Sequence, residues 1–432
     1  MTDIQNASTE GKSYWPVTFF TIWSGQSLAM ITSETVQFAL IWYLTESFRS
    51  ANVVSIATMI ALLPRALLSP FMGALVDHWN RRIVLIVSHT VIILSLVCLG
   101  LLFKTGAASI GAIYMIILIC ACSKSFQMPA MLTSTTLMVP QKYLSRTAGL
   151  NQMVQGIMRV VAPALGAVLV SALPMYAIVA VDITGAFLAI LVLVLVSMPN
   201  PLHLSGSMTL LAGWKSLWTD VRAGVNYVRN WRGAVEMLSI STAINFLSCP
   251  AFMLTSILVT QHFGGTAREF GVIGMAIGIG MISGGMLLSF WNGFHRPMQT
   301  SLVGIIGMGF AILVTGLAPT SAFWLATGGM FIGGLMIPVC MAPIQALIQK
   351  TVEPTMQGRV LTLLDSVSTV ASPLSLAIAG PLFDYLGPQV WYIGSGLLAV
   401  FIGVIGFAKP LVLNLGLVQS ASESYVQVEK TI

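Results

Sequence analysis

Long apolar stretches, separated by short polar segments, recur along almost the whole chain. Each runs for roughly 18 to 28 residues, and about 20 apolar residues are enough for one helix to cross a bilayer. The pattern therefore predicts an all-α membrane protein with twelve transmembrane helices. The predicted spans are 17–45, 52–76, 83–103, 109–138, 147–172, 175–198, 234–259, 269–291, 298–318, 321–346, 357–383 and 389–410.

The composition excludes a water-soluble protein. Hydrophobic residues make up 56% of the chain and charged residues only 8%, and the mean hydropathy is +0.89. A net charge of +6 therefore gives no reason to expect a nucleic-acid partner. The polar stretch before the first span carries no small-residue cleavage site, so we expect no removable signal peptide. All 5 cysteines lie inside apolar runs, without the spacing of a metal site, so we expect no metal or cofactor.

Lysine and arginine are distributed unequally between the two sides of the predicted bundle. With the N-terminus in the cytoplasm, the cytoplasmic segments hold fourteen of these residues and the opposite side three. Short cytoplasmic loops keep positive residues because translocating them is unfavourable. We therefore expect both termini in the cytoplasm and a multi-pass protein of the bacterial inner membrane.

The longest polar interruption separates two groups of six spans. It predicts an N-terminal bundle at 1–198, a cytoplasmic linker at 199–233, and a C-terminal bundle with its tail at 234–432. Within the linker, apolar residues from Trp214 to Trp231 recur every three or four positions, and Lys215, Arg222 and Arg229 recur every seven. This pattern predicts an amphipathic helix, which lies either on the membrane surface or against the underside of the bundle.

The two halves also match each other at an offset of 214 residues. This offset superposes Pro129 on Pro343, Pro140 on Pro354, Gly166 on Gly380 and Arg82 on Arg296. One offset shared by several turn and span positions indicates an internal repeat. Parallel repeats are typical of secondary transporters, whose halves rock about a site near the membrane midplane.

The segment from Gly73 to Arg82, between the second and third spans, has the sequence GALVDHWNRR. It resembles the GxxxDRxGRR signature of the major facilitator superfamily through Gly73, Asp77, Arg81 and Arg82. Its second-half counterpart, Gly285 to Arg296, has Ser289 in place of the acid. An acid and basic residues in such a turn can lock one conformation, or the two arginines can serve only as cytoplasmic anchors.

Six further stretches resemble the macrolide-efflux branch of that superfamily, whose members are drug exporters with twelve spans. The resemblance implies the major facilitator fold and drug efflux by proton antiport. No GxSxG, HExxH, P-loop or nucleotide-binding motif accompanies a plausible catalytic partner, so we expect a transporter without enzymatic activity or cofactors. The stretches are 22–26, 43–46, 63–70, 180–182, 357–360 and 379–384.

Ionisable residues inside the spans are the main candidates for function, because a charge at a helix centre costs about 2.5 to 3.5 kcal/mol. Glu34, Arg65, Lys124 and Arg159 fall at similar depths, counted along their helices. We expect an ion pair between Glu34 and Arg65, which either fixes helix packing or exchanges with a proton. The proton-coupling candidates are Glu34, Asp182 and Asp365. Asp182 lies nearer the outer end, where a capping role is an equal alternative.

We expect the substrate cavity to be lined by charged, polar and aromatic residues from both halves. Its cations favour acidic substrates, whereas the family resemblance favours macrolides, which are cationic. Export of an amphipathic small molecule by a monomer is the leading hypothesis. A lysophospholipid flippase, or an exporter of an acidic metabolite such as a siderophore, is the alternative. The predicted cavity residues are Gln26, Gln37, Arg65, Lys124, Arg159, Asn245 and Phe246.

Overall fold

The computed structural model describes residues 15–140, 143–196, 222, 229, 234–291, 293–294, 296–352 and 354–413. The described residues form helices and no strands, and most of the helices are long. Eleven of these helices are long and apolar enough to cross a membrane. The predicted all-α membrane fold is therefore confirmed. Most of the linker at 199–233, with its predicted amphipathic helix, lies outside the described residues.

Contacts between Cα atoms divide the chain into two compact units. Unit 1 consists of residues 1–43 and 60–214, and unit 2 of residues 44–59 and 215–432. The second unit thus includes the end of the first long helix and the beginning of the next. The domain boundaries predicted at 198 and 233 stay a prediction.

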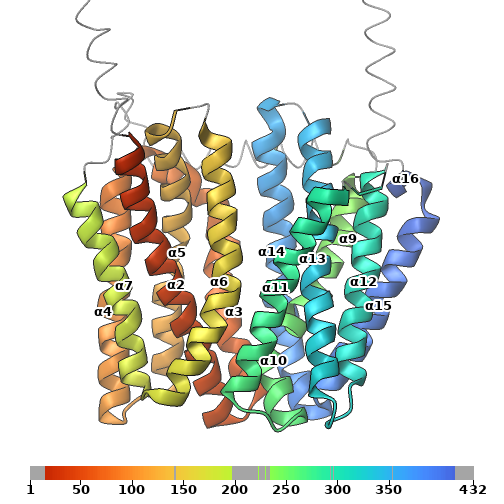
Figure 1. The fold of residues 1–432 in the computed structure, drawn as a ribbon, viewed down its shortest axis with the longest axis horizontal. Helices are drawn as coiled ribbons and strands as arrows, with labels where there is room; N and C mark the ends of the chain where they lie inside the picture. The colour runs from red at the N-terminus through yellow and green to blue at the C-terminus, as the bar shows by residue number, and fades with distance from the viewer. Residues whose placement is uncertain are drawn as a thin grey trace, which may run out of the picture. The chain divides into compact units, whose positions relative to one another are not determined.

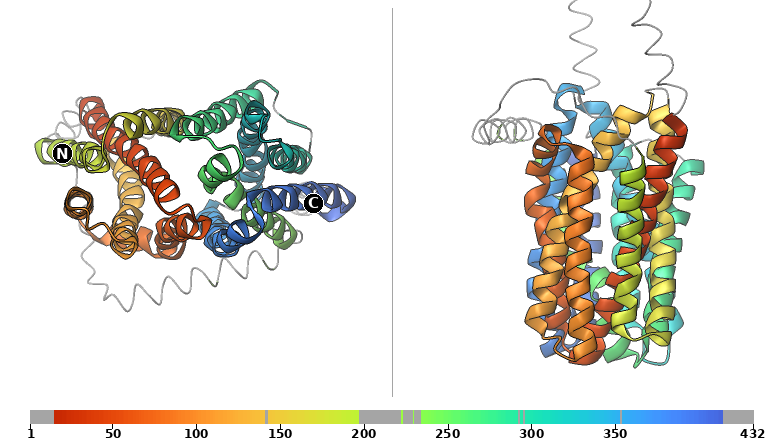
Figure 2. Two further views of the ribbon diagram at one scale, coloured as in Figure 1. Left: turned by 90° about the horizontal axis from the view of Figure 1, so that it is seen from below. Right: turned by 90° about the vertical axis from the view of Figure 1, so that its left-hand side faces the viewer.

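Unit 1 is built from six long helices that run alongside one another (Figure 1). Helix α4 packs against both α5 and α7, and the end-on view separates these helices clearly (Figure 2). A core of apolar side chains, which includes Phe19, Leu85 and Leu193, joins the helices near one end. The helices are α2 (Trp15–Phe48), α3 (Ala51–His78), α4 (Arg81–Thr105), α5 (Ile110–Met138), α6 (Leu144–Ala172) and α7 (Met175–Leu195).

The described residues of unit 2 form another six long helices. Helix α12 packs against α13 and α15, α13 packs against α11, and α14 packs against α9. The long helices are α9 (Ala234–Met253), α11 (Ala267–Trp291), α12 (Pro297–Leu317), α13 (Phe323–Thr351), α14 (Pro354–Leu386) and α15 (Pro388–Ala408). The short elements are α10 (Thr255–Ile257), the π-helical turn η2 (Leu258–His262) and α16 (Pro410–Leu413).

Glycines allow several of these helices to touch without intervening side chains. A β-carbon at Gly309 of α12 would lie 2.9 Å from the carbonyl oxygen of Gly396 on α15. At Gly304, a β-carbon would lie 2.7 Å from the backbone nitrogen of Cys340 on α13. Such close approach is typical of membrane helices. Lipid provides no hydrophobic driving force between them, and small residues let the backbones come close enough for van der Waals packing.

The predicted seventh span differs from the observed structure. The apolar run 234–259 predicts one continuous helix, but α9 ends at Met253 and the chain continues through α10 and the π-helical turn. In that turn the backbone N–H of Phe263 donates to the carbonyl of Leu258, five residues earlier. Apolar periodicity over a few residues does not distinguish such a short, wider turn from a continuing α-helix.

Candidate functional site

Asp182 is a buried carboxylate in the middle of α7, with 5% of its surface exposed. The Thr32 hydroxyl on α2 donates to its Oδ1 atom over 3.5 Å. Gly185, one turn further along α7, lies directly against Thr32, and this contact sets the close approach of the two helices. Lys124 on α5 is the cation that acts electrostatically on the Asp182 carboxylate. The structure therefore brings together two predicted site residues that the depth count had separated.

His89 on α4 forms a second buried polar group in unit 1, with 4% of its surface exposed. Its Nε2 atom lies 2.9 Å from Oε1 of Gln26, and its Nδ1 atom lies 3.4 Å from Nε2 of Gln127. A carbonyl acceptor at Nε2 and an amide donor at Nδ1 are compatible with a neutral imidazole that carries its proton on Nε2.

The charge of Lys124 also acts on His89, so this lysine interacts with both the histidine and Asp182. Sequence reasoning did not select His89. The available signal was its position inside an apolar run, since any ionisable residue within a span is a functional candidate.

Glu34, Arg65 and Arg159 lie on α2, α3 and α6 of unit 1, and all three are exposed. Within the described ranges, neither Glu34 nor Arg65 takes part in an ion pair, so the pair predicted between them is not formed.

The remaining predicted cavity residues lie in different surroundings. Gln26 is buried and is hydrogen-bonded to His89, whereas Gln37 is half-buried. In unit 2, the half-buried Asn245 accepts a hydrogen bond of 3.3 Å from the Ser372 hydroxyl. Asp365 belongs to α14, but its side chain lies outside the described residues.

The segment from Gly73 to Arg82 contains the end of α3 and the beginning of α4. Gly73 and Asp77 belong to the last turns of α3, and their side chains are outside the described part of the chain. Asn80 is the N-cap of α4, where its side chain accepts from the backbone N–H of Arg82 and of Ile83.

Arg82 has a role that neither sequence hypothesis included. Its Nε atom donates to the carbonyl oxygen of Leu193 and its Nη2 atom to that of Val194, each over 2.7 Å. These carbonyls belong to the C-terminal end of α7, where backbone acceptors lack helical partners and the helix dipole is negative. Arg82 therefore caps α7. The neighbouring Arg81 is half-buried.

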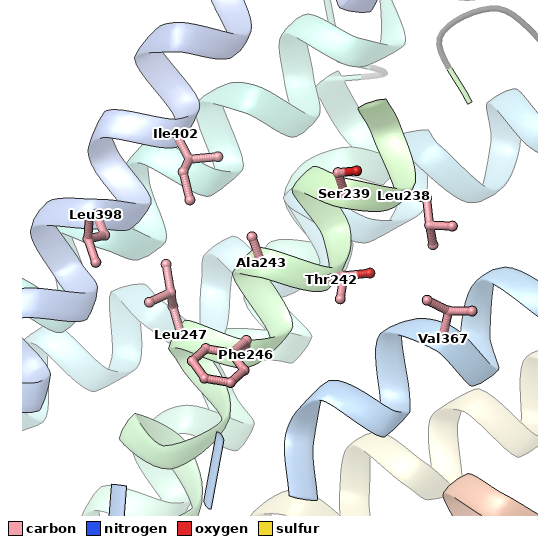
Figure 3. Close-up of a pocket in the computed structure, with 9 residues that line it drawn as sticks. All are labelled: Leu238, Ser239, Thr242, Ala243, Phe246, Leu247, Val367, Leu398 and Ile402. Atoms are coloured by element: carbon pink, nitrogen blue, oxygen red, sulfur yellow. The ribbon is translucent and has the colours of Figure 1, made fainter. Parts of the chain in front are cut away.

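Unit 2 contains an open groove of about 630 Å³ between α9, α14 and α15 (Figure 3). Its lining is apolar except for two hydroxyl groups, those of Ser239 and Thr242. The predicted cavity residue Phe246 lies in this groove, and its ring centroid is 6.1 Å from that of Trp391. The lining residues are Leu238, Ser239, Thr242, Ala243, Phe246, Leu247, Val367, Leu398 and Ile402.

In the described part of the chain, no group of three or more His, Cys, Asp and Glu side chains is placed to hold a metal ion. The chemistry of the site is that of buried and exposed charges inside membrane-spanning helices, together with an apolar groove. Such groups can bind a solute and exchange a proton.

Two groups of six long helices, related by an internal repeat and carrying charges within their spans, define a secondary transporter rather than an enzyme. A family model described as "Transmembrane secretion effector" matches residues 14–405. The chain belongs to this family of the major facilitator superfamily.

Several relatives of the chain are named as efflux proteins. Macrolide efflux protein A of Streptococcus pyogenes is 29% identical over 391 residues, which cover 90% of this chain and 95% of that protein. The multidrug efflux pump Tap of Mycolicibacterium fortuitum is 26% identical over 390 residues, covering 87% of this chain and 91% of the pump.

The fold is also that of solved transporters. A crystal structure of a peptide transporter POT superposes with a TM-score of 0.70 at 11% identity, covering 93% of this chain and 95% of the other. At this level of identity the likeness concerns the fold. The resemblance to the major facilitator superfamily and its macrolide-efflux branch is confirmed.

Proposed function

We propose that the protein exports amphipathic small molecules, such as macrolide-like drugs, in exchange for protons by alternating access. The observation that carries this proposal is the buried Asp182 carboxylate beside Lys124, inside the helices of a chain whose relatives are efflux pumps. A carboxylate buried among membrane helices needs either a cation or a proton. Asp182 can therefore alternate between an ion pair with Lys124 and a protonated state.

Glu34 is the second coupling candidate. It lies two residues after Thr32 on α2, it is exposed, and its charge acts on Asp182. Within this proposal, Glu34 passes protons between water and the buried carboxylate. Asp365 remains a third candidate from its position in a span.

Arg65 and Arg159 line the polar part of the proposed transport path, because charged side chains in spans face a wet cavity rather than lipid. Gln37 and Asn245 add hydrogen-bonding groups to the path. We place the protein in the bacterial cytoplasmic membrane, as a monomer with both termini in the cytoplasm, since the arginine and lysine distribution favours that orientation.

The groove beside Phe246 supports an amphipathic rather than a fully polar substrate. Apolar side chains bind apolar groups by excluding water, at about 25 cal/mol per Å² buried. An open apolar groove also suits an acyl chain, so lysophospholipid flipping remains the second candidate function. Export of an acidic metabolite is the third, supported by the cations on α3, α5 and α6.

The test is transport by the purified protein in lipid vesicles with an imposed pH gradient. The panel contains a macrolide, a neutral amphiphile, an acidic amphiphile and a lysophospholipid with a labelled headgroup. We expect accumulation of the macrolide against its own gradient, and loss of that accumulation when a protonophore collapses the pH gradient. Lysophospholipid movement that ignores the pH gradient, without macrolide transport, would replace export by flipping.

A further inference from the structure

The connection between α2 and α3 is attached to unit 2 although both helices continue into unit 1. Residues 44–59, which contain the end of α2 and the first turns of α3, group with unit 2 by their contacts. We call this segment the α2–α3 tip. The chain enters unit 2 after Tyr43 and leaves it after Met59.

Asp384, near the end of α14, holds the tip through three hydrogen bonds. Its Oδ1 atom accepts from the backbone N–H of Ala51 over 2.6 Å. Its Oδ2 atom accepts from the backbone N–H of Asn52 over 3.0 Å and from the Ser50 hydroxyl over 2.7 Å. Ala51 and Asn52 begin α3, where backbone N–H groups lack helical partners and the helix dipole favours an anion. A carboxylate more than 300 residues away in the chain thus caps α3.

The same face of α14 packs directly against the first turns of α3. Leu376, Gly380 and Asp384 are spaced by four residues, so they form one stripe along the helix. A β-carbon at Gly380 would lie 2.7 Å from Cβ of Ser55, and the Ser55 hydroxyl donates to the carbonyl of Leu376. No side chain separates the two helices at this point.

A second set of bonds holds the tip from the other side. The Thr45 hydroxyl donates to the Ser256 hydroxyl on α10 over 2.8 Å. The Gln261 side-chain amide, in the π-helical turn, donates to the carbonyl of Arg49 over 3.3 Å. Arg49 joins the two helices of the tip in a left-handed conformation, with φ of 49°.

We propose that Asp384 is a latch that holds the α2–α3 tip on unit 2 and must release it during each transport cycle. The tip belongs to unit 2 by its contacts, but α2 (Trp15–Phe48) and α3 (Ala51–His78) run unbroken from the tip into unit 1. A movement of unit 1 that keeps these two helices straight therefore carries the tip away from Asp384. Charge-assisted bonds to the start of α3 stabilise the docked tip. The latch does not depend on the transported substrate and goes beyond the proposed function.

Two buried positions report on the latch. Ala51 and Ser256 are both 0% exposed, and Ser256 contacts the tip through Thr45, without a bond to Asp384. Each is replaced separately, as Ala51→Cys or Ser256→Cys, in a full-length background whose native cysteines are replaced by serine or alanine. The rate of maleimide labelling is measured on purified protein in detergent, with the cysteine-free background as the blank.

We expect Asp384→Asn to accelerate labelling at both positions by about twofold to fivefold, the factor that a charge at a helix N-terminus typically contributes. Ser50→Ala removes one of the three bonds, together with the bond that the Ser50 hydroxyl accepts from the backbone N–H of Val53, and should give a smaller acceleration. The matched control is Glu269→Gln, because Glu269 bonds only to the start of its own helix through Thr266. It should leave both rates unchanged.

Two results would overturn the latch. Unchanged labelling at both positions in Asp384→Asn and Ser50→Ala would mean that the tip stays docked without these bonds. Faster labelling at Ala51→Cys alone would mean that Asp384 only prevents local fraying of α3. Neither measurement requires a substrate, so failure of the latch and failure of the proposed export are distinguished.

Discussion

At the scale of single residues, the two coupling candidates Glu34 and Asp182 lie in opposite surroundings. Asp182 is buried, bonded to Thr32 and influenced by Lys124, whereas Glu34 is exposed. A carboxylate fixed beside a lysine can change its charge together with a change of the helices around it. An exposed carboxylate changes its charge with little consequence for packing.

We therefore expect Asp182→Asn to abolish transport driven by a pH gradient while downhill exchange of the same substrate continues. Glu34→Gln, the matched control, should keep part of the pH-driven transport. Lys124 interacts electrostatically with Asp182, so loss of the carboxylate leaves the charge of Lys124 uncompensated inside the helices. The double variant Asp182→Asn with Lys124→Gln should therefore recover the stability lost in the single variant, without recovering coupling. Uphill transport by Asp182→Asn, with loss in Glu34→Gln, would move the coupling site to Glu34.

Arg82 gives a second prediction at this scale. Two bonds from its guanidinium cap α7, and a lysine cannot reproduce this fork although it keeps the charge. Arg82→Lys should therefore lower the free energy of unfolding by about 1 to 2 kcal/mol, measured by thermal unfolding in detergent. Arg296→Lys is the control, because the guanidinium of this repeat counterpart makes no hydrogen bond to a described residue. Equal stability of both variants would leave Arg82 as an anchor of membrane orientation alone.

The sequence predicts which residues carry charge inside the spans, but not which of them meet. Counting 1.5 Å per residue along upright helices places Asp182 well away from Lys124. A lysine side chain is long, and helical side chains lean toward the N-terminus of their helix. For Lys124 this direction leads toward the end of unit 1 where both α5 and α7 begin. The charge of Lys124 therefore acts on a carboxylate that the backbone count leaves apart.

At the scale of helices, apolar run length was sufficient to locate almost every span. The observed helices begin and end within a few residues of the predicted limits, for instance α12 at 297–317 against 298–318. The length of an apolar run does not predict which glycines lie against a neighbouring helix. Gly394 and Gly396 lie on the same helix, but only Gly396 contacts another backbone, that of α12. Such contacts depend on the facing helix, which is distant in the sequence.

This difference predicts the outcome of two otherwise identical substitutions. In Gly396→Ala, the new methyl group would lie 2.7 Å from the backbone nitrogen of Leu313, so α12 and α15 must separate. We expect a loss of about 1 to 3 kcal/mol, as in other overpacked interiors. Gly394→Ala meets no heavy atom within 4 Å and should be neutral. Thermal unfolding of the two purified variants compares them directly, and equal melting temperatures would contradict this assignment of α15 packing.

At the scale of the whole molecule, the internal repeat predicts two groups of six helices. It does not predict that the α2–α3 tip groups with unit 2 instead of unit 1. Contacts assign residues 44–59 to unit 2. The bonds responsible join Asp384 to backbone N–H groups of α3, and backbone groups carry no sequence signal. Offset matching does pair Gly166 with Gly380, and both lie in close contacts, with Phe38 and Ser55 respectively. The two halves thus carry glycine at equivalent positions, but the residue that each glycine contacts differs.

The charge balance of unit 1 bears on the choice of substrate. Its spans hold two carboxylates, Glu34 and Asp182, and three cations, Arg65, Lys124 and Arg159. Lys124 interacts with Asp182, so the exposed Arg65 and Arg159 together outweigh the exposed Glu34. This excess favours acidic substrates, whereas the relatives named for macrolide efflux handle a cationic drug class.

Arg159→Gln tests whether this excess selects substrates. Removing Arg159 leaves one exposed cation and one exposed carboxylate within the spans of unit 1. We therefore expect transport of acidic amphiphiles to fall about tenfold relative to transport of cationic ones, equivalent to about 1.4 kcal/mol. The ratio of the two initial rates in the same vesicles is the measurement, since a change in expression or folding affects both alike. Arg268→Gln is the control, because Arg268 is also an arginine but lies in the first turn of α11. A proportional loss of both substrates in Arg159→Gln would assign Arg159 to structure, and the acidic-metabolite alternative would lose its physical basis.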